Sequence, residues 1–206
     1  MISGLEALER LREGNDRFVS GILSGDSFAS RSHRNELPDR QEPIAIVLGC
    51  SDARVPAEIV LGQGIGDLFV IRVAGNIVAP SQIGSVEFAA TRFGTRLVVV
   101  LGHSRCGAVA ATLEALRQPL EKQSRNLHAI VDRIAPSLVP LLETELERGS
   151  DSLLEQAVRA NIRASVSQLR HGSEILESLI ETDGLLVVGA DYSLEAGSVD
   201  FFDVPG

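Results

Sequence analysis

Two short polar segments carry the side chains whose types and spacing could do chemistry. The first begins at Cys50 and contains Asp52 and Arg54, and the second holds His103 and Cys106. Each segment directly follows a short apolar run rich in β-branched residues, so each is predicted to be a loop that leaves the carboxyl end of a buried strand. Ligands of open α/β sheets bind at that edge. We therefore expect the two segments to meet there.

Two thiolates and one imidazole form a suitable ligand set for zinc. Cys106 follows His103 by three residues, so one tight turn can aim both at a single ion, while Cys50 arrives from a neighbouring strand. The alternative is a pair of ordinary buried cysteines beside an unremarkable loop histidine. A structural disulfide is disfavoured, since cysteine pairs in a reducing compartment more often bind metal or do chemistry.

The number of available ligands favours a catalytic metal site over a structural one. The chain has no further cysteine, and its other histidines, His33, His128 and His171, lie in polar or helical stretches. Structural zinc sites are usually closed by four protein ligands, whereas catalytic sites keep one position for water. Whether Asp52 itself takes the fourth position stays open at this point.

Asp52 and Arg54 are two residues apart, which places both side chains on one side of an extended segment. Arg54 can hold the carboxylate in a bidentate pair and keep Asp52 ionised as a hydrogen-bond acceptor beside the metal. The alternative is a surface ion pair of little energetic value.

Composition limits the class of protein and the kind of partner. The chain has 206 residues, 44% of them hydrophobic, and a formal net charge of -9. One domain with an ordinary core is expected. The acidic balance, without any Lys/Arg cluster, argues against a nucleic-acid or anionic-membrane partner and favours a small molecule. No signal peptide or membrane-spanning run is evident, so a soluble, cytoplasmic protein is expected.

Periodicity predicts an α/β fold with a mainly parallel central sheet flanked by helices. Residues 1–42 are expected to form an N-terminal helix and arm, and residues 43–206 the α/β core. A capping box at Ser3 and Glu6 begins the first helix, Gly4–Val19, and a polar arm, Gly21–Glu42, follows it. The predicted strands are Ile44–Gly49, Asp67–Val73, Arg96–Gly102, Leu185–Ala190 and Ser198–Phe202, the last two as a hairpin at the sheet edge. The predicted helices of the core are Pro56–Leu61, Ser81–Phe93, Gly107–Leu116, Arg125–Ala135, Leu138–Arg148 (divided from its predecessor by Pro136) and a long helix from Asp151, with a capping box at Ser152 and Glu155.

The motifs Cys50-x-Asp52-x-Arg54 and His103-x-x-Cys106 resemble those of the β-class carbonic anhydrases. Further matches lie at 50–58, 67–72, 76, 84–87 and 102–108. The resemblance implies Zn²⁺ held by Cys50, His103 and Cys106, with Asp52 as a fourth ligand in a closed form, and a catalytic pair of Asp52 and Arg54. It also implies reversible hydration of carbon dioxide to bicarbonate and a proton by attack of zinc-bound hydroxide.

The resemblance extends to substrate-binding positions and to assembly. Gln41, Phe69, Phe88 and Gly107 match residues of the family's narrow substrate pocket. In that family the minimal unit is a dimer whose pocket is lined from both subunits, with the N-terminal helix on the partner. A homodimer or a dimer of dimers is therefore expected here, and it would explain the arm.

Three positions depart from the family pattern, and two other functions stay open. Ala53 and Val73 replace residues that are not ligands, so altered loop hydrogen bonding is expected rather than lost chemistry. Val47 stands where the bicarbonate-regulated subgroup has tryptophan, so the chain looks more like the unregulated, open-site subgroup. The alternatives are a hydrolase of carbonyl sulfide or carbon disulfide on the same zinc site, and a non-catalytic protein in which zinc is structural.

Overall fold

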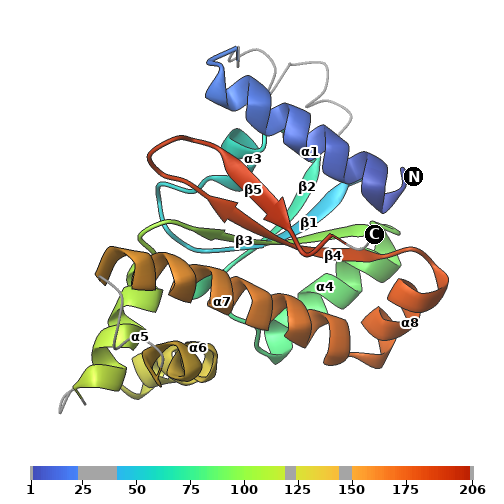
Figure 1. Ribbon diagram of the computed structural model, residues 1–206. Helices are drawn as coiled ribbons and strands as arrows, with labels where there is room; N and C mark the ends of the chain where they lie inside the picture. The colour runs from blue at the N-terminus through green and yellow to red at the C-terminus, as the bar shows by residue number, and fades with distance from the viewer. Residues whose placement is uncertain (1, 23–40, 119–123, 144–149, 205–206) are drawn as a thin grey trace.

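A five-stranded sheet organises the chain in this computed structural model, which describes residues 2–22, 41–118, 124–143 and 150–204 (Figure 1). The strand order is β2-β1-β3-β4-β5. The first four strands are parallel, and β5 runs antiparallel to β4 as the predicted edge hairpin. The predicted α/β class is confirmed. The strands are β1 (Ala45–Gly49), β2 (Leu68–Arg72), β3 (Leu97–His103), β4 (Leu186–Tyr192) and β5 (Val199–Phe202).

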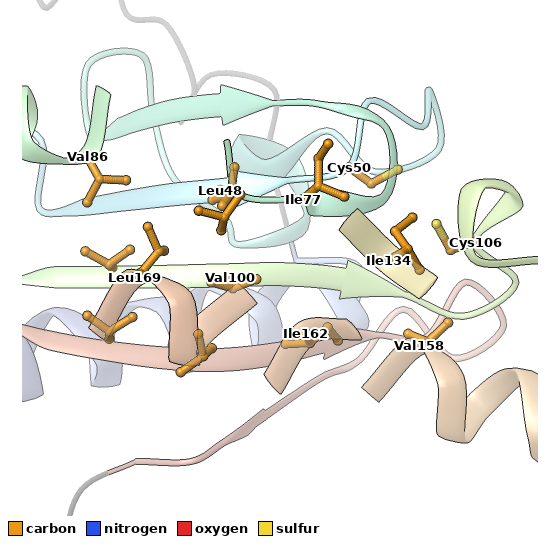
Figure 2. Packing of buried hydrophobic residues seen from close by; sticks show 14 of the residues in the cluster. Leu48, Cys50, Ile77, Val86, Val100, Cys106, Ile134, Val158, Ile162 and Leu169 are labelled. Carbon is orange, nitrogen blue, oxygen red and sulfur yellow. The ribbon is translucent and has the colours of Figure 1, made fainter. Parts of the chain in front are cut away.

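Helices cover both faces of the sheet, because alternate residues of each central strand point to opposite sides. One face packs on α1 (Gly4–Val19) and the short α3 (Ala57–Val60) through residues such as Val47 and Val99. The other packs on the remaining helices through residues such as Leu48 and Val100 (Figures 1 and 2). Those helices are α4 (Pro80–Arg92), α5 (Gly107–Arg117), α6 (Arg125–Glu143), α7 (Ser150–His171) and α8 (Glu174–Thr182), and a 3-10 turn, η2 (Ala74–Asn76), follows β2.

The N-terminal helix has the predicted bounds. Ser3 caps it, with its side chain accepting the backbone N–H of Glu6 at 3.2 Å. Buried Leu8 and Leu11 face the sheet. Most of the predicted arm, together with Ser152 of the second predicted capping box, lies outside the described residues and side chains. Among the described helices, none is long and apolar enough to span a membrane.

One helix prediction was wrong, and one helix was missed. Pro136 does not divide two helices, since α6 runs continuously through it. The carbonyl that Pro136 leaves without a partner belongs to exposed Asp132, where water can reach it, and buried Ile134 and Leu138 hold both sides of the proline to the core. The helix α8 was not predicted at all; it begins at a Ser173 cap after α7 ends.

Candidate metal centre

The three predicted metal ligands converge at the carboxyl edge of two adjacent strands. Cys50 directly follows β1, His103 is the last residue of β3, and Cys106 is the residue before α5 begins. Because β1 and β3 are parallel neighbours, their carboxyl ends lie together. Figure 2 shows Cys50 and Cys106 at the same end of the apolar core, with Leu48 and Val100 further back along the strands.

The geometry of the cluster fits a metal ion with soft ligands. One ligand atom from each of Cys50, His103 and Cys106 lies within 4.8 Å of the others, and all three side chains are buried. His103 Nδ1 lies 2.9 Å from the carbonyl oxygen of Ser104. In a neutral imidazole that donates from Nδ1 to that oxygen, Nε2 carries the lone pair, and Nε2 is buried without a hydrogen-bond partner. An orphaned imidazole nitrogen facing two thiols is what a zinc site requires.

The two thiols compete for a proton. The hydrogen bond from Cys106 lowers the pKa of Cys50 to about 4, against the opposing effect of burial. The same hydrogen bond, together with burial, raises the pKa of Cys106 far above its usual value. Cys50 is therefore ionised readily, and Cys106 only with difficulty. A bound dication would replace the proton of Cys106, so both sulfurs would be thiolates in the metal-bound form.

The turn between His103 and Cys106 is held by the loop that follows β4. Arg105 has a φ of 55°, in the left-handed region that favours glycine. Glu195 accepts a hydrogen bond from Ser104 Oγ at 2.9 Å and pairs with Arg105 Nε at 2.7 Å. Glu195 therefore holds both residues that separate His103 from Cys106, including Arg105 in its left-handed conformation.

The predicted pair of Asp52 and Arg54 is present and bidentate. Arg54 Nε and Nη2 donate to the two carboxylate oxygens of Asp52 at 2.9 and 2.7 Å. These hydrogen bonds hold the pKa of Asp52 well below its usual value. Asp52 Oδ2 lies 3.8 Å from His103 Nε2, so the ionised carboxylate borders the metal cluster. Arg72 positions the whole loop, since its Nε and Nη2 donate to the carbonyl oxygens of Cys50 and Asp52 at 3.0 and 2.6 Å.

Of the four predicted substrate-binding residues, only Gly107 lies beside the cluster of its own chain. Gly107 follows Cys106, and open space surrounds the position of its missing Cβ. Gln41 is exposed and precedes β1, whereas Cys50 follows it. Phe69 and Phe88 pack together, with ring centroids 6.2 Å apart, and Phe69 lies near the start of β2 rather than at its carboxyl end.

Sequence reasoning missed several residues that shape the centre from a distance. The backbone N–H of Gly75 donates to Cys50 Sγ at 3.4 Å. Asn161 and Ser165, both on α7, bond the backbone of the turn that contains Gly75. The Gly-Asn pair at 75–76 is a turn signal that could have indicated an unusual backbone, but nothing in the sequence of α7 connects it to Cys50.

Comparison with known proteins identifies the family. The carbonic anhydrase family model matches residues 45–199, which include all three members of the metal cluster. Carbonic anhydrase 2 of Mycobacterium tuberculosis is 36% identical over 93% of this chain and 89% of its own length. A carbonic anhydrase of Mycolicibacterium smegmatis is 37% identical over 94% and 91%. The crystal structure of the β-carbonic anhydrase CafA of Aspergillus fumigatus aligns with a TM-score of 0.74 and 26% identity over 84% and 83% of the two chains. With this match over most of its length and a buried Cys-His-Cys cluster at the sheet edge, the chain belongs to the β-class carbonic anhydrase family.

Proposed function

We propose that the protein is a zinc-dependent carbonic anhydrase that interconverts carbon dioxide and bicarbonate. The observation that carries the proposal is the convergence of Cys50, His103 and Cys106 around an unpartnered His103 Nε2, with an ionised carboxylate at the border of the cluster. These three residues would hold the ion. Zinc bound there would supply a Lewis acid that makes a water molecule acidic enough to react near neutral pH.

The role we assign to Asp52 follows from its charge state. Because Arg54 occupies both carboxylate oxygens and lowers the pKa of Asp52, this side chain only accepts hydrogen bonds. It therefore selects an attacking oxygen whose proton points at the carboxylate and whose lone pair points away, toward the substrate carbon. Arg72 fixes this orientation by clamping the carbonyl oxygens on either side of Ser51.

We further propose that a homodimer completes the substrate pocket. Gln41, Phe69 and Phe88 are the predicted pocket residues that lie away from the cluster of their own chain, so a second subunit would have to bring them to it. Two features support this assembly: β2 is an edge strand of the described sheet, and Phe88 beside it is 53% exposed. Size-exclusion chromatography with light scattering would distinguish a dimer or a dimer of dimers from a monomer, and a monomer of full activity would refute the shared pocket.

The proposal also covers subgroup, domain and compartment. Val47, which is buried on the α1 face, stands where the bicarbonate-regulated subgroup has tryptophan, so we assign the chain to the subgroup that bicarbonate does not regulate. We treat residues 1–206 as one domain, because the two apolar clusters lie on opposite faces of the same sheet. A reducing compartment such as the cytoplasm suits the site, since metal binding needs Cys50 and Cys106 as free thiols.

The deciding experiment is stopped-flow carbon dioxide hydration on protein of measured zinc content. The initial rate should scale with bound zinc, disappear on chelation and return when zinc is restored. A protein with one zinc per chain and no hydration activity would refute the proposal. Hydrolysis of carbonyl sulfide or carbon disulfide by such a protein would favour the hydrolase alternative, and the absence of any turnover would favour a structural metal.

A further inference from the structure

The turn at 74–76 places a hydrogen-bond donor against one of the metal-binding thiols. Gly75 N lies 3.4 Å from Cys50 Sγ, inside the range for a hydrogen bond to sulfur. The turn is an unusual one, because Gly75 has a φ of 71° and Asn76 a φ of 43°, both in the left-handed region. Asparagine enters this region more readily than most residues, but two successive left-handed residues still cost conformational free energy, which contacts from other elements can offset.

Such contacts come from one face of α7. Asn161 Nδ2 donates to the carbonyl oxygen of Gly75 at 2.8 Å, and Ser165 Oγ donates to the carbonyl oxygen of Asn76 at 3.0 Å. The two side chains are four residues apart on the helix, so they project from the same face. Asn161 is 2% and Ser165 3% exposed, so neither hydrogen bond competes with bulk water.

The turn is also closed from the other side. A Cβ added to Gly75 would lie 2.8 Å from Ile134 Cδ1 and 3.1 Å from Ala108 Cβ, which leaves the peptide little room to shift toward α5 or α6. The direction of the Gly75 N–H is therefore determined by packing on one side and by the α7 hydrogen bonds on the other. If the hydrogen bonds from α7 are lost, the turn can shift only toward α7, because α5 and α6 block the other side. The Gly75 N–H then no longer points at Cys50 Sγ.

A hydrogen bond to a thiolate withdraws electron density from the sulfur and weakens its donation to a metal. This matters most in a ligand set with two thiolates, which already neutralise much of the charge of a dication. We propose that Asn161 and Ser165 are positioning residues of the metal centre, which hold the 74–76 turn so that Gly75 N–H moderates the donor strength of Cys50. The proposal rests on the metal site of the proposed function and assigns to α7 a part in tuning it.

A purely structural role for these side chains makes a different prediction. If Asn161 and Ser165 only satisfy buried carbonyl oxygens, their removal lowers the stability of the fold and leaves the metal ligands unchanged. The test therefore needs a readout at the sulfur. Replacement of zinc by cobalt(II) provides one, because the energy of the sulfur-to-cobalt charge-transfer absorption falls as the thiolate becomes a stronger donor.

The variants are Asn161→Leu, Ser165→Ala and a control, Thr95→Val. Thr95 Oγ1 donates to the carbonyl oxygen of Pro43 at 2.8 Å and is 3% exposed, so this control loses one buried hydroxyl-to-carbonyl bond, as Ser165→Ala does. Thr95 precedes β3, whereas His103 ends it, which separates the control from the metal centre by about 25 Å of extended chain. Each variant is measured as full-length protein for thermal unfolding without metal, zinc affinity by chelator competition, and the cobalt spectrum.

We expect Asn161→Leu to shift the charge-transfer band to lower energy, because Cys50 becomes a stronger donor. Zinc binding should nevertheless weaken about ten-fold, because the released turn no longer holds Cys50 in its metal-binding orientation, and loss of a partner that orients a metal ligand typically costs this much affinity. Ser165→Ala should shift the band in the same direction by less, and it serves alone if Asn161→Leu does not fold. Thr95→Val should lower the unfolding temperature and leave both the band and the zinc affinity as in the unmutated protein.

Unchanged band position and zinc affinity in both α7 variants would overturn the inference and leave the proposed function standing. A cobalt form of the unmutated protein with no sulfur-to-cobalt band would overturn both, because Cys50 would then not be a ligand. The two failures are therefore distinguished by the unmutated protein alone.

Discussion

Gly102 lies directly before the ligand His103. The helix α7 packs so close to this position that no side chain fits there. A Cβ at this position would lie 2.5 Å from Ile162 Cδ1 and 2.6 Å from Ile162 Cγ1. Ordinary carbon–carbon contacts are about 3.5–4.0 Å, so Ile162 would have to withdraw by about 1 Å. Ile162 is fully buried in the core cluster, so it can withdraw only by displacing other core side chains. We therefore expect Gly102→Ala to be destabilised by overpacking.

The size of the effect can be estimated. Overpacking a filled core costs about 1–3 kcal/mol, which is roughly a 5- to 150-fold shift in the unfolding equilibrium. For a chain of this length each kcal/mol corresponds to about 2–4 °C in melting temperature, so a decrease of about 2–12 °C is expected. Ile162→Ala removes both clashing atoms, Cδ1 and Cγ1, and by itself costs about 2–5 kcal/mol.

The double variant tests the reasoning. If the contact with Ile162 is the cause, Gly102→Ala and Ile162→Ala together should be more stable than the sum of the two single effects predicts, by about 1 kcal/mol. Calorimetry or denaturant unfolding at a fixed zinc concentration, repeated after chelation, measures the cycle and separates packing from metal binding. Additivity within about 0.5 kcal/mol, or a Gly102→Ala variant as stable as the unmutated protein, would refute the reasoning.

Three further predictions concern the metal loop and its border. Cys106→Ser should lose stoichiometric zinc and unfold at a lower temperature, and metal analysis showing one tightly bound zinc per chain would exclude Cys106 as a ligand. Asp52→Asn should keep zinc and lose activity about 100-fold, because an amide can donate where a pure acceptor is needed; stopped-flow rates near those of the unmutated enzyme would contradict the assigned role. Glu195→Ala should weaken zinc binding a few-fold by releasing Arg105 from its left-handed conformation. Adding Arg105→Gly should restore the affinity, since glycine adopts that conformation freely; chelator competition that shows no recovery would place the effect of Glu195 elsewhere.

Much of the metal centre was predictable from local pattern. The apolar runs before Cys50 and His103 have the composition of parallel strands buried on both faces, and the carboxyl ends of such strands share one edge. That edge, together with the short spacing of His103 and Cys106, was enough to bring the three ligands together. The pairing of Asp52 with Arg54 was predictable for the same reason, because it depends on two residues of one extended segment.

Other features depended on contacts between segments that are distant in sequence. One is the continuity of α6 through Pro136, which depends on Asp132 being exposed to water and on Ile134 and Leu138 being buried in the core. The periodicity of the sequence does not reveal either.

The support of the metal centre has the same origin. Asn161 reaches the backbone of Gly75 only because α7 packs across the carboxyl end of β3, and Glu195 reaches Arg105 only because β4 lies beside β3. Sequence alone determined which side chains can bind the metal, since ligand chemistry and strand pattern are properties of short segments. The tertiary structure decided how firmly and with what donor strength they are held, because those properties depend on backbone groups whose partners are set by the packing of the whole sheet.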